Sequence, residues 1–316
     1  MNPPDRSSHG RVTVLGVFVA DLVFAAARLP RVGETLKGDG FEIGPGGKGS
    51  NQAVAASRSG AQTNLLTRLG RDAFGDMART LWARDGVSAT VAECDEPTGA
   101  AFVYVNSDTG ENAIIIVPGA AAGLSVADVE AAVPVIKGSQ VFVTQLEQPV
   151  AVALRGLEIA HAHGVTTVFN PAPAVGIPDA IYPLCDYIVP NETEAEVLTG
   201  VRLRSIEDAR RAGDVLLARG VGVALITLGE RGALFHTEGR SVLVPAFRAG
   251  DVVDTTGAGD AFIGSFAAAL ARGDEPLAAT VFGCASAGLA VTRRGTAQAM
   301  PSALQAAFHD TVPPQQ

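Results

Sequence analysis

The sequence predicts a three-layer α/β/α protein with a mostly parallel central sheet, plus a small separate β-sheet. Short runs rich in β-branched residues alternate with longer helical patterns, which is typical of a parallel sheet covered on both faces. Hydrophobic residues make up 47% of the 316 residues and supply a sizeable core, while 36 Gly and 18 Pro supply the short loops of such a fold. Two further stretches alternate in polarity without helices between them, and they predict the small sheet.

Six strand candidates of the central sheet are mostly β-branched runs that end at Gly, Pro or Asn. They are Arg11–Phe18, Asn64–Leu69, Gln140–Gln145, Val165–Asn170, Asp186–Pro190 and Val221–Leu228. The apolar stretch Val12–Ala27 contains Asp21, is too short to span a bilayer and lacks the basic start of a signal peptide. We interpret it as the buried first strand and its exit loop.

Seven segments between these strands have apolar residues at helical spacing. They are Gly49–Ser59, Phe74–Arg84, Pro149–His163, Glu192–Leu198, Ser205–Arg219, Gly259–Arg272 and Pro276–Thr292.

The small sheet is expected from Arg28–Pro45 and Ala100–Val117, the second of which is divided by a turn at Ser107–Gly110. Such strands would form a lid over the carboxyl ends of the main strands, where open α/β sheets bind ligands. We expect the lid strands within residues 17–47 and 98–118.

No internal repeat, low-complexity tract or clear linker divides the chain. We therefore expect a single domain over residues 11–310, preceded by a flexible tail of residues 1–10. The last residues, Thr311–Gln316, are expected to be equally loose.

Charge and cysteine content limit the partners of the chain. The formal net charge is −9, and no run of Lys or Arg exceeds two residues, which argues against nucleic-acid binding. Cys94, Cys185 and Cys284 are widely spaced and odd in number, which indicates reduced thiols rather than disulfides or a zinc site. We expect a soluble cytoplasmic protein that binds no membrane.

The segment Asp254–Asp260, DTTGAGD, places a carboxylate behind a glycine-rich turn that opens a helix. Gly257 and Gly259 lack a Cβ, so backbone N–H groups can approach a ligand, and a helix N-terminus favours an anion such as phosphate. The carboxylate is suited to accept the proton of a hydroxyl that attacks the phosphate. Turn and base together indicate phosphoryl transfer to an alcohol.

A second glycine-rich segment, Gly44–Asn51, resembles a Walker A loop, but Gly49 stands where that motif needs Ser or Thr after Lys48. Its glycines would allow close approach to a small polar ligand, to which Lys48 and Asn51 would hydrogen-bond. A plain tight turn before a helix is the weaker alternative, given four glycines, a Lys and an Asn within eight residues.

A dinucleotide-binding oxidoreductase is the rival from another reaction class. It would show Gly-x-Gly-x-x-Gly after the first strand, where only Gly16 is present, and this argues against it. Asp21 follows the same strand and either holds sugar hydroxyls or forms a turn or helix cap; its spacing alone does not separate these roles.

Other polar residues follow strands at the presumed ligand end. Glu147 follows Gln140–Leu146 directly. Asn191 and Glu194 have the spacing of a helix capping box, and the same pair could anchor a hydrated magnesium ion, since the two roles are compatible. Leu225–Gly232 leaves a strand through a glycine-bounded turn, against which a nucleotide phosphate or ribose could lie.

These segments, in this order, resemble the PfkB family of carbohydrate kinases, of the ribokinase type, over about Arg11–Ser302. The motifs that match are Gly46–Ala56, Asn170–Ala174, Pro190–Glu196 and Asp254–Asp260. The resemblance implies the ribokinase-like fold and transfer of a phosphoryl group from ATP to a sugar.

The resemblance also implies a role for each matching residue. Asp260 would be the general base, and Gly257, Ala258 and Gly259 would form the anion hole for the transferred phosphoryl group. The residues that match sugar-pocket positions are Asp21, Gly47, Lys48, Asn51, Glu147 and Asp260. Those that match positions for magnesium, phosphate and nucleotide are Asn191, Glu194, Thr227, Gly229, Gly232, Gly259 and Cys284.

A monovalent activator, usually potassium, is implied beside the anion hole, held largely by carbonyl oxygens. The residues that match this site are Asp254, Thr256, Ala290, Arg293, Gly295 and Ala299. The expected cofactors are thus ATP, Mg²⁺ and K⁺, and the resemblance further implies a homodimer in which lid strands of two subunits pair.

Three residues depart from the family pattern. Val19 stands where ribokinase-type sequences usually have the Asn that touches the sugar, and a buried hydroxyl left unpaired costs about 1–3 kcal/mol, which suits a substrate such as 2-deoxyribose. Ala299 stands where a Ser often donates a ligand to the cation, and Cys284 replaces a His often found near the adenine.

The sequence therefore predicts an ATP-dependent kinase that phosphorylates the 5-hydroxyl of D-ribose, giving ribose 5-phosphate. The alternatives within the family are 2-deoxyribose, a nucleoside or another small sugar. A sugar-responsive binding protein without catalysis is the alternative outside the enzyme class, and the intact Asp260 and Gly257–Gly259 argue against it.

Overall fold

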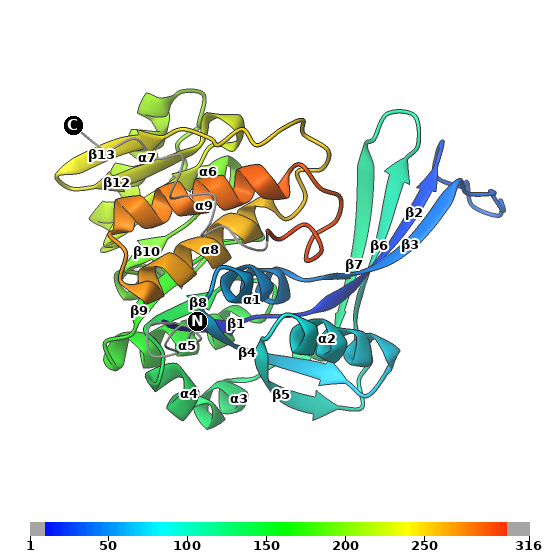
Figure 1. The fold of residues 1–316 in the computed structure, drawn as a ribbon, viewed down its shortest axis with the longest axis horizontal. Helices are drawn as coiled ribbons and strands as arrows, with labels where there is room; N and C mark the ends of the chain where they lie inside the picture. Colours follow the sequence, from blue (N-terminus) through cyan, green and yellow to red (C-terminus); the bar gives the residue numbers. More distant parts are fainter. Residues whose placement is uncertain (1–9, 302–316) are drawn as a thin grey trace, which may run out of the picture.

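A large sheet of nine strands forms the centre of the molecule (Figure 1). The computed structural model describes residues 10–301 of the chain. The strands are β1 (Arg11–Leu15), β4 (Gln62–Gly70), β5 (Ser88–Cys94), β8 (Val141–Thr144), β9 (Thr166–Phe169), β10 (Tyr187–Ile188), β11 (Val223–Thr227), β12 (Ala233–Thr237) and β13 (Arg240–Val244). Their order is β13-β12-β11-β10-β9-β8-β1-β4-β5, and all pairs from β11 to β5 are parallel. The antiparallel strands β12 and β13 close one edge.

Helices cover both faces of this sheet, as the alternation of patterns predicts. The helices on one face are α1 (Lys48–Arg58), α2 (Ala73–Arg84), α8 (Ala258–Arg272) and α9 (Pro276–Ala290). Those on the other face are α3 (Val126–Ala131), α4 (Val133–Lys137), α5 (Val150–Ala162), α6 (Glu192–Thr199) and α7 (Ile206–Ala218). Each layer has its own apolar core, so the predicted three-layer α/β class is confirmed. None of the described helices combines the length and apolar character needed to cross a bilayer.

A second sheet of four strands extends away from the three layers (Figure 1). Its strands are β2 (Val19–Ala26), β3 (Gly40–Gly46), β6 (Thr98–Asn106) and β7 (Asn112–Gly119), in the order β3-β2-β6-β7. The central pair β2 and β6 is parallel, and the outer pairs are antiparallel. A turn around Gly110, at φ 74°, joins β6 to β7 where the sequence predicts one.

The boundaries of the first elements were predicted wrongly. The first strand ends at Leu15, and Val19–Ala26 is not its exit loop but a strand of the small sheet, within the range 17–47 expected for the lid. The chain leaves the main sheet at Gly16, where a Cβ would lie only 2.7 Å from the Cα of Gly49, so this close crossing with α1 sets the end of β1. Within the predicted lid segment Arg28–Pro45, the strand begins only at Gly40.

Several elements were missed altogether. Strand β5 lies at an edge and is largely exposed, so its sequence, SATVAEC, lacks an apolar period. The hairpin β12–β13 and the short helices α3 and α4 were missed as well. Residues 1–9, the predicted end of the domain at 302–310 and Thr311–Gln316 lie outside the described residues.

Helices α1 and α8 pack unusually closely, and this contact positions the candidate site. A Cβ on Gly264 of α8 would lie 2.6 Å from the Cβ of Ala55 and 2.9 Å from the backbone nitrogen of Ala56, both on α1. Only glycine fits there, so the start of α1 is held against the start of α8.

Candidate active site

Three of the predicted site residues lie at the carboxyl ends of parallel strands, where open α/β sheets bind ligands. Glu147 follows β8, Asn191 follows β10, and Thr227 ends β11. Asp21 lies on β2, at the base of the small sheet, and Asp260 lies in the first turn of α8.

Asp260 is buried between α1 and α8, with 7% of its surface exposed. Its Oδ2 accepts a hydrogen bond from Asn51 Nδ2 at 3.1 Å, and its Oδ1 accepts one from Gln52 Nε2 at 2.9 Å. Asn51 Oδ1 is buried and has no partner among the described residues, so it remains an acceptor for a ligand hydroxyl. Sequence reasoning missed Gln52; the available signal was a glutamine inside the otherwise apolar run that follows Asn51.

The turn before α8 has the backbone that an anion site needs. Gly257 is the N-cap of α8 and lies in the left-handed region at φ 80°. The first N–H groups of a helix lack intrahelical acceptors and carry partial positive charge. The Ala258 N–H donates to the Thr255 carbonyl at 3.2 Å, whereas a Cβ on Gly259 would meet no heavy atom within 4 Å, so the turn is open there.

One lysine and several carboxylates surround Asp260. The charge of Asp260, followed by those of Glu147 and Glu194, raises the pKa of Lys48 against the effect of burial. The backbone N–H of Lys48 donates to Glu147 Oε2 at 2.7 Å. Burial raises the pKa of Glu147 to about 7, a shift that Lys48 opposes and the negative charges of Asp260 and Asp21 reinforce.

Glycines make room for this cluster. Gly47, the N-cap of α1, has φ 88°, and a Cβ there would lie 2.6 Å from the carbonyl oxygen of Val17. A Cβ on Gly46 would lie 2.6 Å from Cγ of Asp21. Burial raises the pKa of Asp21 to about 6.

Asn191 and Glu194 form the capping box that their spacing indicates. Asn191 Oδ1 accepts from the Glu194 N–H at 2.9 Å, and Glu194 Oε2 accepts from the Asn191 N–H at 2.8 Å. Glu194 is 6% exposed, and burial raises its pKa. Each carboxylate oxygen accepts one hydrogen bond from Asn191 and keeps capacity for a hydrated cation.

The turn after β11 has a strongly bent backbone. Gly229 and Gly232 have φ values of 54° and 101°, and the Leu228 N–H donates to the Gly232 carbonyl at 2.8 Å. Thr227 is tied to the neighbouring strand end, because its N–H donates to the Pro190 carbonyl at 2.9 Å. Cys284, on α9, is buried, which raises the pKa of its thiol to about 12.

The predicted monovalent-cation site lies on two loops, the one before α8 and the one after α9. Asp254 hydrogen-bonds to both. Its Oδ1 accepts from the Thr256 N–H at 2.9 Å, and its Oδ2 accepts from the Gly295 N–H at 3.0 Å. The Ala290 carbonyl accepts from the Arg293 N–H at 3.0 Å, which uses one of its two lone pairs. Ala299 is fully buried, and its methyl side chain offers no ligand.

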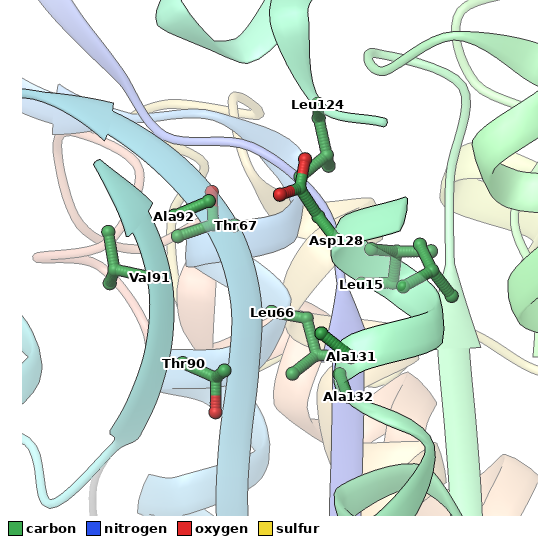
Figure 2. A pocket seen from close by; sticks show the side chains of 11 residues that line it. Leu15, Leu66, Thr67, Thr90, Val91, Ala92, Leu124, Asp128, Ala131 and Ala132 are labelled. Carbon is green, nitrogen blue, oxygen red and sulfur yellow. The ribbon is translucent and has the colours of Figure 1, made fainter. Parts of the chain in front are cut away.

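Among the described residues, no group of three or more His, Cys, Asp or Glu side chains has a metal-binding arrangement. A cavity of about 170 Å³ lies between β4, β5 and α3 (Figure 2). Its walls include Leu66, Thr90, Leu124 and Ala131, and it contains none of the predicted site residues. This cavity is therefore separate from the candidate site.

A buried carboxylate beside a helix N-terminus, at the carboxyl edge of a parallel sheet, is the arrangement expected for phosphoryl transfer to an alcohol. Comparison with known proteins gives the class: the model of the pfkB family of carbohydrate kinases matches residues 10–303, so the chain belongs to this family. It is 38% identical to the deoxyribokinase of Salmonella typhi over 295 residues, 92% of this chain and 95% of that protein. It is 37% identical to the ribokinase of Haemophilus influenzae over 293 residues, 92% of this chain and 95% of the relative.

A solved structure agrees with the sequence relatives. The ribokinase of Arabidopsis thaliana, complexed with ribose and ATP, superposes with a TM-score of 0.85 at 30% identity, over 93% of this chain and 96% of that one. The predicted family and ribokinase-like fold are confirmed.

The raised pKa of Glu147 predicts a pH-dependent stability. The pKa of Glu147 is about 7 in the folded protein and 4.5 in the unfolded chain, so the folded state binds the proton more tightly. The resulting stabilisation is fully present below pH 4.5 and is lost as the pH rises through 7. We expect Glu147→Gln, which keeps a neutral acceptor for the Lys48 N–H, to raise the thermal midpoint of the ligand-free protein at pH 8 and leave it unchanged near pH 4.5. Glu34→Gln is the control, since Arg28 lowers the pKa of Glu34 to about 2, and it should give no gain at pH 8. An equal effect of Glu147→Gln at both pH values would contradict the assignment.

Proposed function

We propose that this carbohydrate kinase transfers the γ-phosphoryl group of ATP to the 5-hydroxyl of D-ribose, giving ribose 5-phosphate and ADP. The observation that carries the proposal is the Asp260 carboxylate, held by two amide donors beside the open N-terminus of α8. Relatives called ribokinase, and the ribose and ATP bound by the Arabidopsis structure, support the substrate pair.

In the proposed reaction Asp260 accepts the proton of the sugar hydroxyl. The hydroxyl oxygen forms a bond to the γ-phosphorus while the bond from that phosphorus to the β-phosphate oxygen breaks, and ADP leaves. The N–H groups at the start of α8, with Gly257 and Gly259 opening the turn, stabilise the charge on the transferred group. Asp21, Asn51 and Glu147 offer acceptors for the other sugar hydroxyls.

The residues present fit the two cations that the family implies. Asn191 and Glu194 would hold Mg²⁺ through its water, because the buried Glu194 keeps acceptor capacity beside Lys48. When bound, magnesium neutralises phosphate charge. The loops joined by Asp254 would hold K⁺ through the carboxylate and backbone carbonyls, with no side-chain ligand from Ala299.

The turn after β11 is proposed to hold the nucleotide, with Thr227, Gly229 and Gly232 along its backbone and Cys284 near the base.

We also propose that residues 11–310 act as one domain with the small sheet as its lid. The described cysteines are all free, which supports a cytoplasmic location.

Replacing Asp260 by Asn should abolish proton acceptance while keeping the shape of the side chain. Turnover is expected to fall by roughly 10²–10⁴-fold, while the affinity for ATP stays within a few-fold. Asp274→Asn is the control, because this carboxylate follows the other end of α8 and pairs with Arg272. Full activity in Asp260→Asn, measured by ADP release, would refute the proposed mechanism.

A specific observation favours 2-deoxyribose as a second candidate substrate. Val19 and Asp21 point to the same face of β2, since strand side chains alternate. Val19 is 5% exposed and packs against Gly99, where a Cβ would lie 3.0 Å from Cγ1 of Val19. An apolar side chain there offers no partner to a sugar hydroxyl.

Activity across sugars separates the two candidates. In an ADP-release assay over pentoses, hexoses and nucleosides, with and without potassium, we expect ribose and 2-deoxyribose to react and potassium to increase the rate. Val19→Asn should raise kcat/KM for ribose relative to 2-deoxyribose by roughly 5–100-fold, the value of one polar contact. Reaction of a nucleoside alone would reject the substrate while keeping the kinase, and an unchanged ratio would reject the role of Val19.

The small sheet is proposed to join two subunits into a homodimer. Phe24, Phe41, Ile43 and Ile115 are exposed by 41–65%, on the face opposite to that of Asp21. The rings of Phe24 and Phe41 lie 4.7 Å apart, so this is a continuous apolar surface. Such surfaces on soluble proteins mark sites of association.

Phe41→Glu should disrupt this association, because it places a charge in the apolar surface. Sedimentation is expected to show a dimer for the unchanged protein and a monomer for the variant. Val32→Glu, at a fully exposed position outside the strands, is the matched control and should remain dimeric. A monomeric unchanged protein would reject the dimer.

A further inference from the structure

Gln52 lies beside the proposed general base, Asp260. It is fully buried, and its side-chain amide is bonded to three other side chains. Nε2 donates to Asp260 Oδ1 at 2.9 Å and to Asn170 Oδ1 at 3.1 Å, while Oε1 accepts from Gln145 Nε2. Asn51, in contrast, keeps a free acceptor, Oδ1. Of these two amide side chains, only Asn51 can therefore hydrogen-bond the sugar directly.

The orientation of the Gln52 amide is set by a backbone group. The Val189 carbonyl can only accept, and it accepts from Asn170 Nδ2 at 2.9 Å. The Oδ1 atom of Asn170 must therefore face Gln52, which turns the NH₂ group of Gln52 toward both Asn170 and Asp260. The opposite amide orientation would place oxygen against oxygen at both contacts.

Gln145 completes the chain from the other side. It is fully buried at the end of β8, and its Nε2 donates to Oε1 of Gln52, so the oxygen of Gln52 is held away from Asp260. Gly16 makes room for Gln145, because a Cβ at Gly16 would collide with its side-chain oxygen. Three strand ends thus supply the groups that orient one amide of α1.

We propose that Gln52 is a positioning residue for phosphoryl transfer: with Gln145 and Asn170 it forms a buried amide chain that presents only N–H to Asp260 and holds its carboxylate toward the sugar. This inference rests on the proposed role of Asp260 as base. A carboxylate held by Asn51 alone would retain rotational freedom, and small errors in the geometry of a base are costly to turnover.

The test uses Gln52→Met, which keeps the length of the side chain and removes its hydrogen bonds. We expect kcat to fall roughly tenfold or more while KM for ATP changes less than about threefold. In the Asp260→Asn background the same substitution should cause no further loss of the residual turnover, because Gln52 acts through Asp260.

Ser265→Ala is the matched control. Ser265 is fully buried on α8 and hydrogen-bonds Ser59 at 2.8 Å and Ser286 at 2.7 Å, and neither hydrogen bond involves Asp260. Both variants should lower the thermal midpoint, but only Gln52→Met should lower kcat. If Gln52→Met does not fold, Gln145→Met provides the same cycle, with a smaller expected loss of kcat.

The outcomes separate this inference from the proposed function. Full activity in Asp260→Asn would overturn both. An inactive Asp260→Asn with unchanged kcat in folded Gln52→Met would overturn only the positioning role. Equal losses from Gln52→Met in the presence and absence of the Asp260 carboxylate would also overturn it, since the effect would then be structural.

Discussion

The two amide N–H groups that α1 directs at the Asp260 carboxylate of α8 are the interaction on which the rest of the site depends. A charge removed from water is costly unless hydrogen bonds replace the lost solvent, and side chains as short as Asn and Gln reach across only when the helices nearly touch. Gly264 permits that approach, since a Cβ there would collide with α1. The packing of two helices is thereby linked directly to the chemistry proposed at their N-termini.

The same burial makes the unliganded site electrostatically costly. Burial raises the pKa values of Asp21, Glu147 and Glu194, and a single lysine, Lys48, interacts with the charges of Asp260, Glu147 and Glu194. These groups would be replaced by apolar residues if stability alone mattered. Sugar hydroxyls are donors, and in the proposed complex they would supply the hydrogen bonds that water no longer provides. The cost in the free protein is thus consistent with a binding role for the cluster.

Local patterns predicted most of the fold, because strands and helices of the main layers have strong and different apolar periods. The glycine-rich turns were recognisable because Gly257 and Gly47 need backbone conformations that other residues avoid. The polar Gln52 stands out in an apolar run, but its contacts were not predictable, since its partners Asn170 and Asp260 lie 118 and 208 residues away in the sequence. Strand β2 was misread for a related reason: its apolar residues continue those of β1, and only the crossing with Gly49 separates the two strands.

The loop that follows α9 explains why separate motifs could not define the whole site. Its Gly295 N–H binds Asp254, which also accepts from the turn before α8, and Thr296 Oγ1 donates to the Pro45 carbonyl on β3 at 2.6 Å. Further along the loop, the Met300 carbonyl accepts from Arg58 at the end of α1. The small sheet, the turn before α8 and helix α1 are therefore hydrogen-bonded to one segment that has no glycine-rich motif of its own. A change in this loop would act on all three at once, so its sequence is constrained by the site.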